Sequence, residues 1–71
     1  MTNTELLKQK IDDSGVKYAF IADKLGMSRQ GLSQKIAQNG DFKAWQMLLI
    51  VDILHLSDDD AREIFYPQNV D

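Results

Sequence analysis

Cysteine is absent from this chain of 71 residues, which excludes disulfide bonds and thiolate metal sites. No apolar run approaches the roughly 20 residues that cross a bilayer, and the first residues lack a signal-peptide pattern. We therefore expect a cytoplasmic protein with a single domain over residues 1–71. Because so short a chain buries only a modest share of its surface, we expect tight helix packing or self-association to stabilise it.

Patterns typical of catalytic and metal sites are also missing. His55 is the single histidine, so it has no second histidine or cysteine with which to share a metal ion. We expect it either to cap a helix or simply to be exposed. The run Asp58–Asp60 lacks the glycine and the closing glutamate of a calcium loop. These absences predict no enzyme activity, no catalytic residue, no metal site and no cofactor.

Positive charge is scarce but unevenly distributed. The formal net charge is −3, yet residues 17–43 hold five lysines and arginines against Asp23 and Asp41, a balance of +3. The remaining residues therefore carry the acidic excess. One part of the molecule can face a phosphate backbone while the rest points away from it.

Apolar residues recur at helical spacing along most of the chain, and no segment alternates with a period of two. This pattern predicts an all-α fold with helices at about residues 3–13, 17–25, 29–37, 42–54 and 58–65. Thr2 and Glu5 have the spacing of a capping box before the first helix. Asp41 is expected to cap the fourth helix and Ser57 the fifth.

The segment Ala22–Leu32 carries the functional prediction. Its pattern is that of a short helix, a turn beginning at Gly26, and a second helix capped by Ser28. Such a pair of helices projects the first turn of its second helix outward, where it can enter the major groove of DNA. The expected exposed residues there are Ser28, Arg29, Gln30, Ser33, Gln34 and Lys35.

The exposed side chains suit the edges of bases. Arginine matches the O6 and N7 acceptors of guanine, and glutamine matches the N6 and N7 edge of adenine. Basic residues on either side can contact phosphates and thereby set the register on the duplex. These flanking residues are Lys17, Lys24 and Lys43. The residues therefore predict a protein that binds double-stranded DNA sequence-specifically.

The chain resembles the Cro/C1-type helix-turn-helix family of temperate-phage repressors over about residues 5–56, most densely from Ile21 to Ile36. The resemblance implies a five-helix lambda-repressor-like domain that reads operator DNA as a dimer in the host bacterial cytosol. Carried over by position, the base-reading residues are Arg29, Gln30, Ser33 and Gln34. Tyr18, Ser28 and Lys35 join the three lysines as phosphate contacts. Two positions depart from the family pattern: Lys35 stands where many members bury an apolar residue, and Tyr18 where many have glutamine.

Two other interpretations remain open. The same residues can be the packing positions and the solvated face of a helix pair that binds no DNA. The sequence is also similar to small acidic phage modulators, which act by docking on a repressor protein rather than on an operator. A modulator would depend on apolar anchors such as Trp45 or on the acidic face, whereas an operator binder would depend on Arg29 and Gln34.

The expected fourth helix is apolar on every side and must be covered on every side. Helical spacing assigns one face to the core, namely Ala44, Met47, Leu48, Val51 and Leu54. A second stripe consists of Trp45, Leu49 and Ile53. We expect it to form a dimer or partner surface together with residues of the C-terminal segment, namely Phe65, Tyr66 and Val70. The alternative is that the fifth helix and the C-terminal tail cover this stripe within one monomer.

Overall fold

The computed structural model describes residues 2–38 and 40–67, which form five α-helices and no strand. The helices are α1 (Thr4–Ser14), α2 (Tyr18–Lys24), α3 (Arg29–Gln38), α4 (Ala44–Leu54) and α5 (Asp58–Phe65). Each helix begins and ends within two residues of the range expected from the sequence. The prediction of an all-α fold is confirmed. Within the described ranges, no helix has both the length and the apolar composition needed to cross a membrane.

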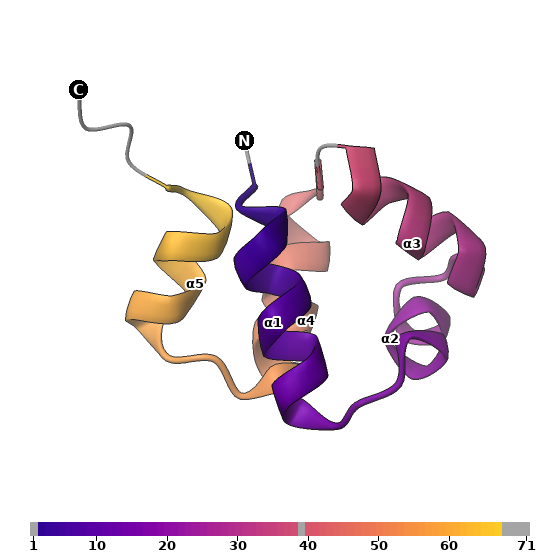
Figure 1. Cartoon of the computed structure of the whole chain (residues 1–71), viewed down its shortest axis with the longest axis horizontal. Coiled ribbons are helices and arrows are strands. Elements are labelled where there is room, and N and C mark those ends of the chain that lie inside the picture. Colours follow the sequence, from indigo (N-terminus) through magenta and orange to yellow (C-terminus); the bar gives the residue numbers. More distant parts are fainter. Residues whose placement is uncertain (1, 39, 68–71) are drawn as a thin grey trace.

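The first helix lies in the middle of the molecule. Figure 1 shows α4 behind α1, α5 on one side, and α2 and α3 together on the other. Leu7 and Ile11 lie one helical turn apart on α1, and both are almost completely buried. They meet buried side chains from all the other helices and from the segment before α4, namely Ile21, Ala22, Leu25, Leu32, Ile36, Phe42, Ile50, Leu54, Ile64 and Phe65. Each large member of this core contributes about 1.5–3 kcal/mol through burial.

The start of α1 differs from the expected capping box. Asn3, not Thr2, is the N-cap, and its Oδ1 accepts a hydrogen bond from the Leu6 N–H at 3.2 Å. Thr2 is buried instead, and its hydroxyl donates to the Gly40 carbonyl. The Asn3 N–H donates to the Ile64 carbonyl at 2.6 Å. The residues before α1 are therefore held between the end of α5 and the loop that precedes α4, and this tertiary anchoring displaces Thr2 from the cap.

The N-cap of α4 also differs from the prediction. The helix begins at Ala44 with Lys43 as its N-cap, so the expectation that Asp41 caps it is wrong. The Gln46 side chain accepts a hydrogen bond from the Lys43 N–H at 2.8 Å. The physical reason is Phe42, which is 4% exposed and packs edge-on against Phe65 with ring centroids 6.3 Å apart. Inserting this ring into the core keeps the chain non-helical until residue 43.

The face of α4 that enters the core is the expected one only in part, because Leu54 is buried and Met47 and Val51 are half-buried against the core. Gln46, Ile50 and Leu54 are its buried residues, whereas Ala44 and Leu48 are exposed. The prediction that Ala44 and Leu48 fill the core is therefore wrong. Because α4 is apolar on nearly every side, its periodicity does not distinguish one face from another. Its contacts with α1 and α2 decide which face is buried.

The ends of two helices match their sequence signals. The Ser57 Oγ accepts a hydrogen bond from the Asp60 N–H at 3.1 Å and caps α5 as expected. His55 ends α4 in the left-handed conformation, with φ 52°, and its N–H donates to the Asp52 carbonyl at 3.3 Å. Both expectations for His55 are therefore confirmed, because the residue caps α4 and its side chain is exposed.

Candidate nucleic-acid interface

A tight turn joins α2 to α3 and fixes their relative orientation. Gly26 has φ 72°, a conformation that glycine adopts without the steric cost of a Cβ. The Met27 N–H then donates to the Ala22 carbonyl at 3.0 Å, which closes the end of α2. Ala22 and Leu32 are each 1% exposed in the crossing between the helices. Figure 1 shows α2 nearly end-on while α3 runs across the view, so the two helices cross steeply.

The first turn of α3 is capped by Ser28. Its Oγ accepts a hydrogen bond from the Gly31 N–H at 2.9 Å, and its carbonyl accepts one from the Leu32 N–H at 3.0 Å. The predicted N-cap is therefore confirmed. The positive end of the helix dipole lies at this exposed turn, where an anion is favoured. The Ser28 side chain is also exposed, so its hydroxyl hydrogen can point outward to an acceptor.

The four predicted base-reading residues fall into two adjacent stripes on α3. Gln30 and Gln34 are one turn apart and both exposed. Arg29 and Ser33 are likewise one turn apart, with Arg29 exposed and Ser33 half-buried. The second stripe faces α1 and lines a groove of about 280 Å³. The structure therefore brings all four to one side of α3 but gives them two different environments.

The groove beside Arg29 also contains a residue that the sequence analysis missed. Lys8 of α1 lines it together with Tyr18, Arg29 and Ser33. Two cationic groups and two hydroxyls around one recess form a surface that suits a phosphate oxygen. No local sequence signal identifies Lys8, because only the packing of α1 against α3 brings it there.

Tyr18 lines this groove, and its hydroxyl can donate a hydrogen bond there. Its partial burial raises the pKa of the phenol above the ordinary value, and the Asp12 carboxylate raises it further, whereas the Arg29 guanidinium acts in the opposite direction. The hydroxyl therefore keeps its proton at neutral pH. A phenol that keeps its proton can donate to a phosphate oxygen at the position where the resemblance places such a contact.

The predicted phosphate-contacting lysines are placed in different ways. Lys17 and Lys43 are exposed at the N-caps of α2 and α4. Lys24 is exposed, and its Nζ lies 5.4 Å from the centre of the Phe20 ring. Lys35 is half-buried, with its Nζ 5.6 Å from the centre of the Phe42 ring. A lysine that covers an aromatic ring is held in place and still presents its charge at the surface.

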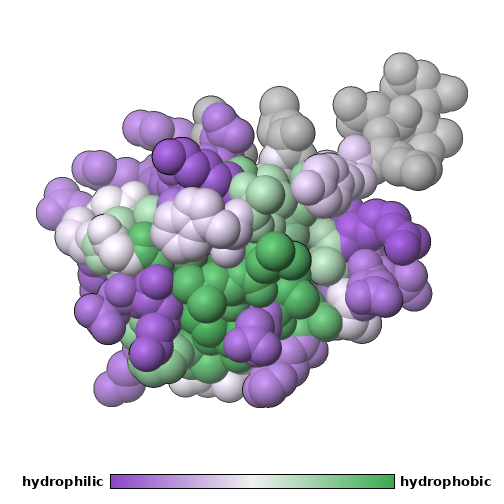
Figure 2. Space-filling model, turned by 180° about the vertical axis from the view of Figure 1, so that it is seen from behind, coloured by the Kyte–Doolittle hydropathy of each residue, from purple (hydrophilic) through white to green (hydrophobic). Residues whose placement is uncertain are grey.

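The predicted apolar partner surface is split by the fold. Trp45 is 53% and Tyr66 65% exposed, whereas Leu49 and Ile53 are half-buried and Phe65 is only 4% exposed. Leu48, which helical spacing assigns to the core, is 71% exposed, more than any other large apolar residue that the structure describes. Figure 2 shows a broad green region on the face where α4 lies. Val70 falls outside the described residues.

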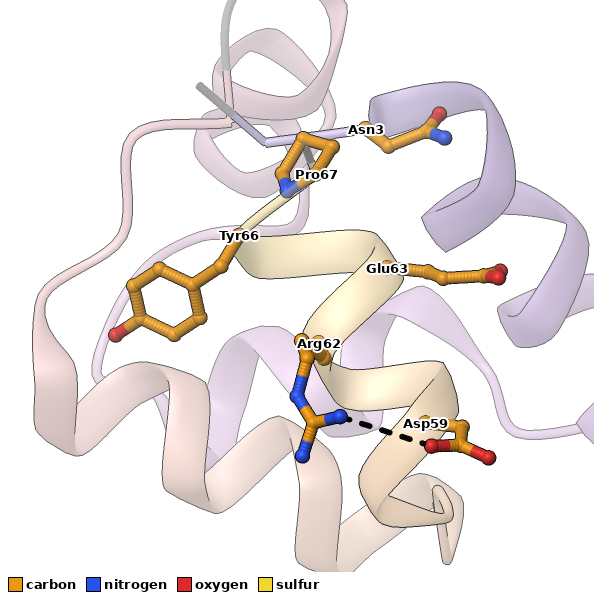
Figure 3. Close-up of a pocket in the computed structure, with 6 residues that line it drawn as sticks. All are labelled: Asn3, Asp59, Arg62, Glu63, Tyr66 and Pro67. Carbon is orange, nitrogen blue, oxygen red and sulfur yellow. Dashed lines mark ion pairs between the residues drawn. The ribbon is translucent and has the colours of Figure 1, made fainter. Parts of the chain in front are cut away.

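A second recess beside α5 has mixed polar character. It measures about 530 Å³ and is lined by Asn3, Asp59, Arg62, Glu63, Tyr66 and Pro67. Figure 3 shows that Arg62 turns toward Asp59, with which it forms an ion pair of 3.8 Å, while Tyr66 and Glu63 point in different directions. These polar groups do not converge on one point, so they are not arranged around a common reacting atom. No group of three acidic, histidine or cysteine side chains in residues 2–38 and 40–67 is arranged to hold a metal ion.

Comparison of the chain with family models, curated proteins and solved structures finds no match.

Proposed function

We propose that this protein is a sequence-specific DNA-binding transcriptional regulator of the Cro/C1 repressor-like type. The observation that carries the proposal is the geometry of α3, whose capped first turn presents Arg29 and Gln30 to solvent, with Gln34 exposed one turn later. Its opposite face is anchored by Leu32 and Ile36, each 1% exposed. A recognition helix needs this combination of a rigid buried side and a projecting polar side.

The exposed side chains define how α3 would bind in the major groove. Arg29 donates two hydrogen bonds to a guanine, and Gln30 or Gln34 pairs with an adenine edge. Lys17, Lys24 and the hydroxyl of Tyr18 hold the phosphates on either side. Since few cations face the DNA, we expect the affinity to fall less steeply with salt than for a strongly basic repressor.

Occupation of an operator would regulate transcription by blocking a promoter. This role belongs in a compartment that contains DNA, which for a phage-type repressor is the host bacterial cytosol. The local charge supports it, because residues 17–43 carry a balance of +3 while the whole chain carries −3. The cationic side would turn toward DNA and the acidic side away from it.

The test is a selection from random double-stranded DNA at moderate salt, run on the wild type and on the double variant Arg29→Ala/Gln34→Ala. We expect a symmetric site to be enriched by the wild type and lost by the variant. The matched control is Gln9→Ala/Asp13→Ala, which removes two polar side chains from exposed positions on α1. Loss of enrichment in both double variants, or no enrichment by the wild type, would contradict the proposal.

A second candidate function is favoured by a different observation. The net charge of −3 and the exposed Trp45 suit a modulator that docks on a repressor protein. Such a protein would bind its partner through apolar anchors and acidic side chains rather than through Arg29 and Gln34. A wild type that selects no DNA, and whose regulatory effect survives Arg29→Ala/Gln34→Ala but not Trp45→Ala, would favour this role.

A further inference from the structure

The outward face of α4 is apolar although it lies in solvent. From Ala44 to Leu54 the single charged residue is Asp52. Leu48 is 71% and Trp45 53% exposed, and the exposed Ala44 lies beside them. A contiguous apolar surface with polar residues at its edge marks an interaction site in a small protein.

A groove runs beside this face, between α4 and α5. It has a volume of about 370 Å³, and its walls include Met47, Leu48, Val51, Phe65 and Tyr66. The Tyr66 hydroxyl lies 3.5 Å from the Met47 sulfur, so it ties the two walls together. Protruding side chains and a recess therefore lie next to each other on one surface. This combination allows a surface to be complementary to a rotated copy of itself.

We propose that a second copy of this chain docks here, with the two α4 helices antiparallel and crossing at Leu48 in a two-fold dimer. The spacing on the outward face supports this arrangement, because its residues are placed symmetrically about Leu48. Trp45 would lie opposite Val51 of the second copy, three residues to either side of the crossing. Ala44 would lie opposite Asp52, four residues to either side. Each half of the face thus meets the other half, as a two-fold interface requires.

The charges at the edge of the face match in the same arrangement. Asp52 of the second copy approaches the N-terminus of α4, where the helix dipole is positive and Lys43 is exposed. The groove itself carries Asp58 and Arg62, which have opposite signs. On α4 itself, the antiparallel pairing therefore places no like charges directly against each other, although the whole chain is acidic.

The available area predicts a weak dimer. A small but specific interface buries about 500–600 Å² on each copy. The chain exposes 4946 Å², so this interface would cover about a ninth of its surface. Helix α4 is about 16 Å long, and together with the adjoining side of α5 it can supply such an area. We expect dissociation constants in the micromolar range.

Sedimentation without DNA, from about 5 to 500 µM protein, tests the proposal. The wild type should pass from monomer to dimer, and Leu48→Lys should raise the dissociation constant by about tenfold or more. Leu48 is exposed, and lysine is a good helix former, so the fold should be retained. The matched control is Phe20→Lys, which alters a 50% exposed aromatic residue on α2 and should leave the dimer intact. A monomer at every concentration, or equal weakening by both variants, would overturn the proposal.

Disulfide trapping tests the geometry. The described residues contain no cysteine, and neither does the rest of the sequence, so single cysteines can be introduced without interference. A disulfide needs Cα atoms about 4.4–6.8 Å apart. Leu48→Cys should therefore form a covalent dimer in a glutathione buffer, and Phe20→Cys should form one far more slowly. Mixed Trp45→Cys and Val51→Cys chains should join to each other in preference to themselves.

Equal trapping at positions 48 and 20, or no preference in the mixture, would contradict an antiparallel crossing at Leu48. Neither experiment contains DNA, so its failure would leave the operator-binding proposal standing. Conversely, a dimer that binds no operator would retain this interface and remove the proposed function.

Discussion

Helices α3 and α4 are nearly equal in length but present opposite surfaces. On α3 the exposed side chains, such as Arg29 and Gln34, are mostly polar, and the two large apolar ones, Leu32 and Ile36, are buried. On α4 the exposed side chains include Trp45 and Leu48, while the polar Gln46 is buried. A polar exposed face remains solvated until a specific ligand arrives, whereas an apolar exposed face gains free energy from almost any cover. The two helices therefore offer different chemistry to a partner, namely hydrogen-bonding groups on α3 and an apolar surface on α4.

If the two surfaces work separately, a substitution on one should leave the other unchanged. The largest departure from this rule is expected for a core residue that supports both. Leu32→Ala should lower the free energy of unfolding by about 2–5 kcal/mol, because Leu32 is 1% exposed in the core. Both DNA binding and self-association should then be lost. Urea denaturation measures the effect. Gln34→Ala, at an exposed position of the same helix, should change stability by less than about 0.5 kcal/mol.

On the α3 surface, Arg29→Ala should weaken binding to the selected operator by about 1–3 kcal/mol and relax the preference at one base pair. The dimer should be unaffected. Fluorescence anisotropy with the operator and its single-base variants separates the outcomes. An equal loss on every sequence would make Arg29 a phosphate contact rather than a base contact.

Lys8→Ala should have a smaller effect that does not depend on the DNA sequence. If Lys8 contacts a phosphate from the groove beside Tyr18, its removal should weaken all DNA binding and reduce the salt slope by about 1. The matched control is Lys10→Ala on the same helix, because Lys10 is engaged with Asp60 at 3.3 Å. An unchanged salt slope in Lys8→Ala would remove Lys8 from the interface.

The smallest effect is expected at the end of α4. His55 adopts the left-handed conformation with φ 52°, which costs a residue with a Cβ more than it costs glycine. His55→Gly should raise the free energy of unfolding by about 0.5 kcal/mol, after the greater freedom of glycine in the unfolded chain is subtracted. His55→Ala keeps the Cβ and should give no gain. Neither change should alter DNA binding.

The sequence predicts the bounds of α2 and α3 better than it predicts the orientation of α4, and the reason is physical. The bounds of α2 and α3 follow from local signals, since Gly26 and Ser28 act on backbone groups within a few residues of themselves. The same holds for Ser57 at α5. The orientation of α4 depends on what packs against it, and a helix that is apolar on nearly every side gives no local indication of its buried face. Helical spacing therefore assigns Leu48 to the core although it is exposed.

In the candidate site too, some features follow from local sequence signals and others depend on packing between helices. The exposure of Arg29, Gln30 and Gln34 follows from helical spacing once Leu32 and Ile36 are placed in the core. The partial burial of Ser33 and the approach of Lys8 depend on the packing of α1 against α3, which has no signature in either segment. Likewise, the spacing of Thr2 and Glu5 indicates a capping box, but Thr2 bonds to the distant Gly40 carbonyl instead.

The attachment of the N-terminal segment has a consequence for the order of folding during synthesis. Asn3 bonds to Ile64, almost at the other end of the described chain, and Thr2 bonds to Gly40. Contacts so distant in sequence form late, whereas α2 and α3 are neighbours and can pair early. The growing chain can therefore assemble its candidate recognition helix before α1 is secured. It reaches its final, cooperative stability only after translation has passed α5.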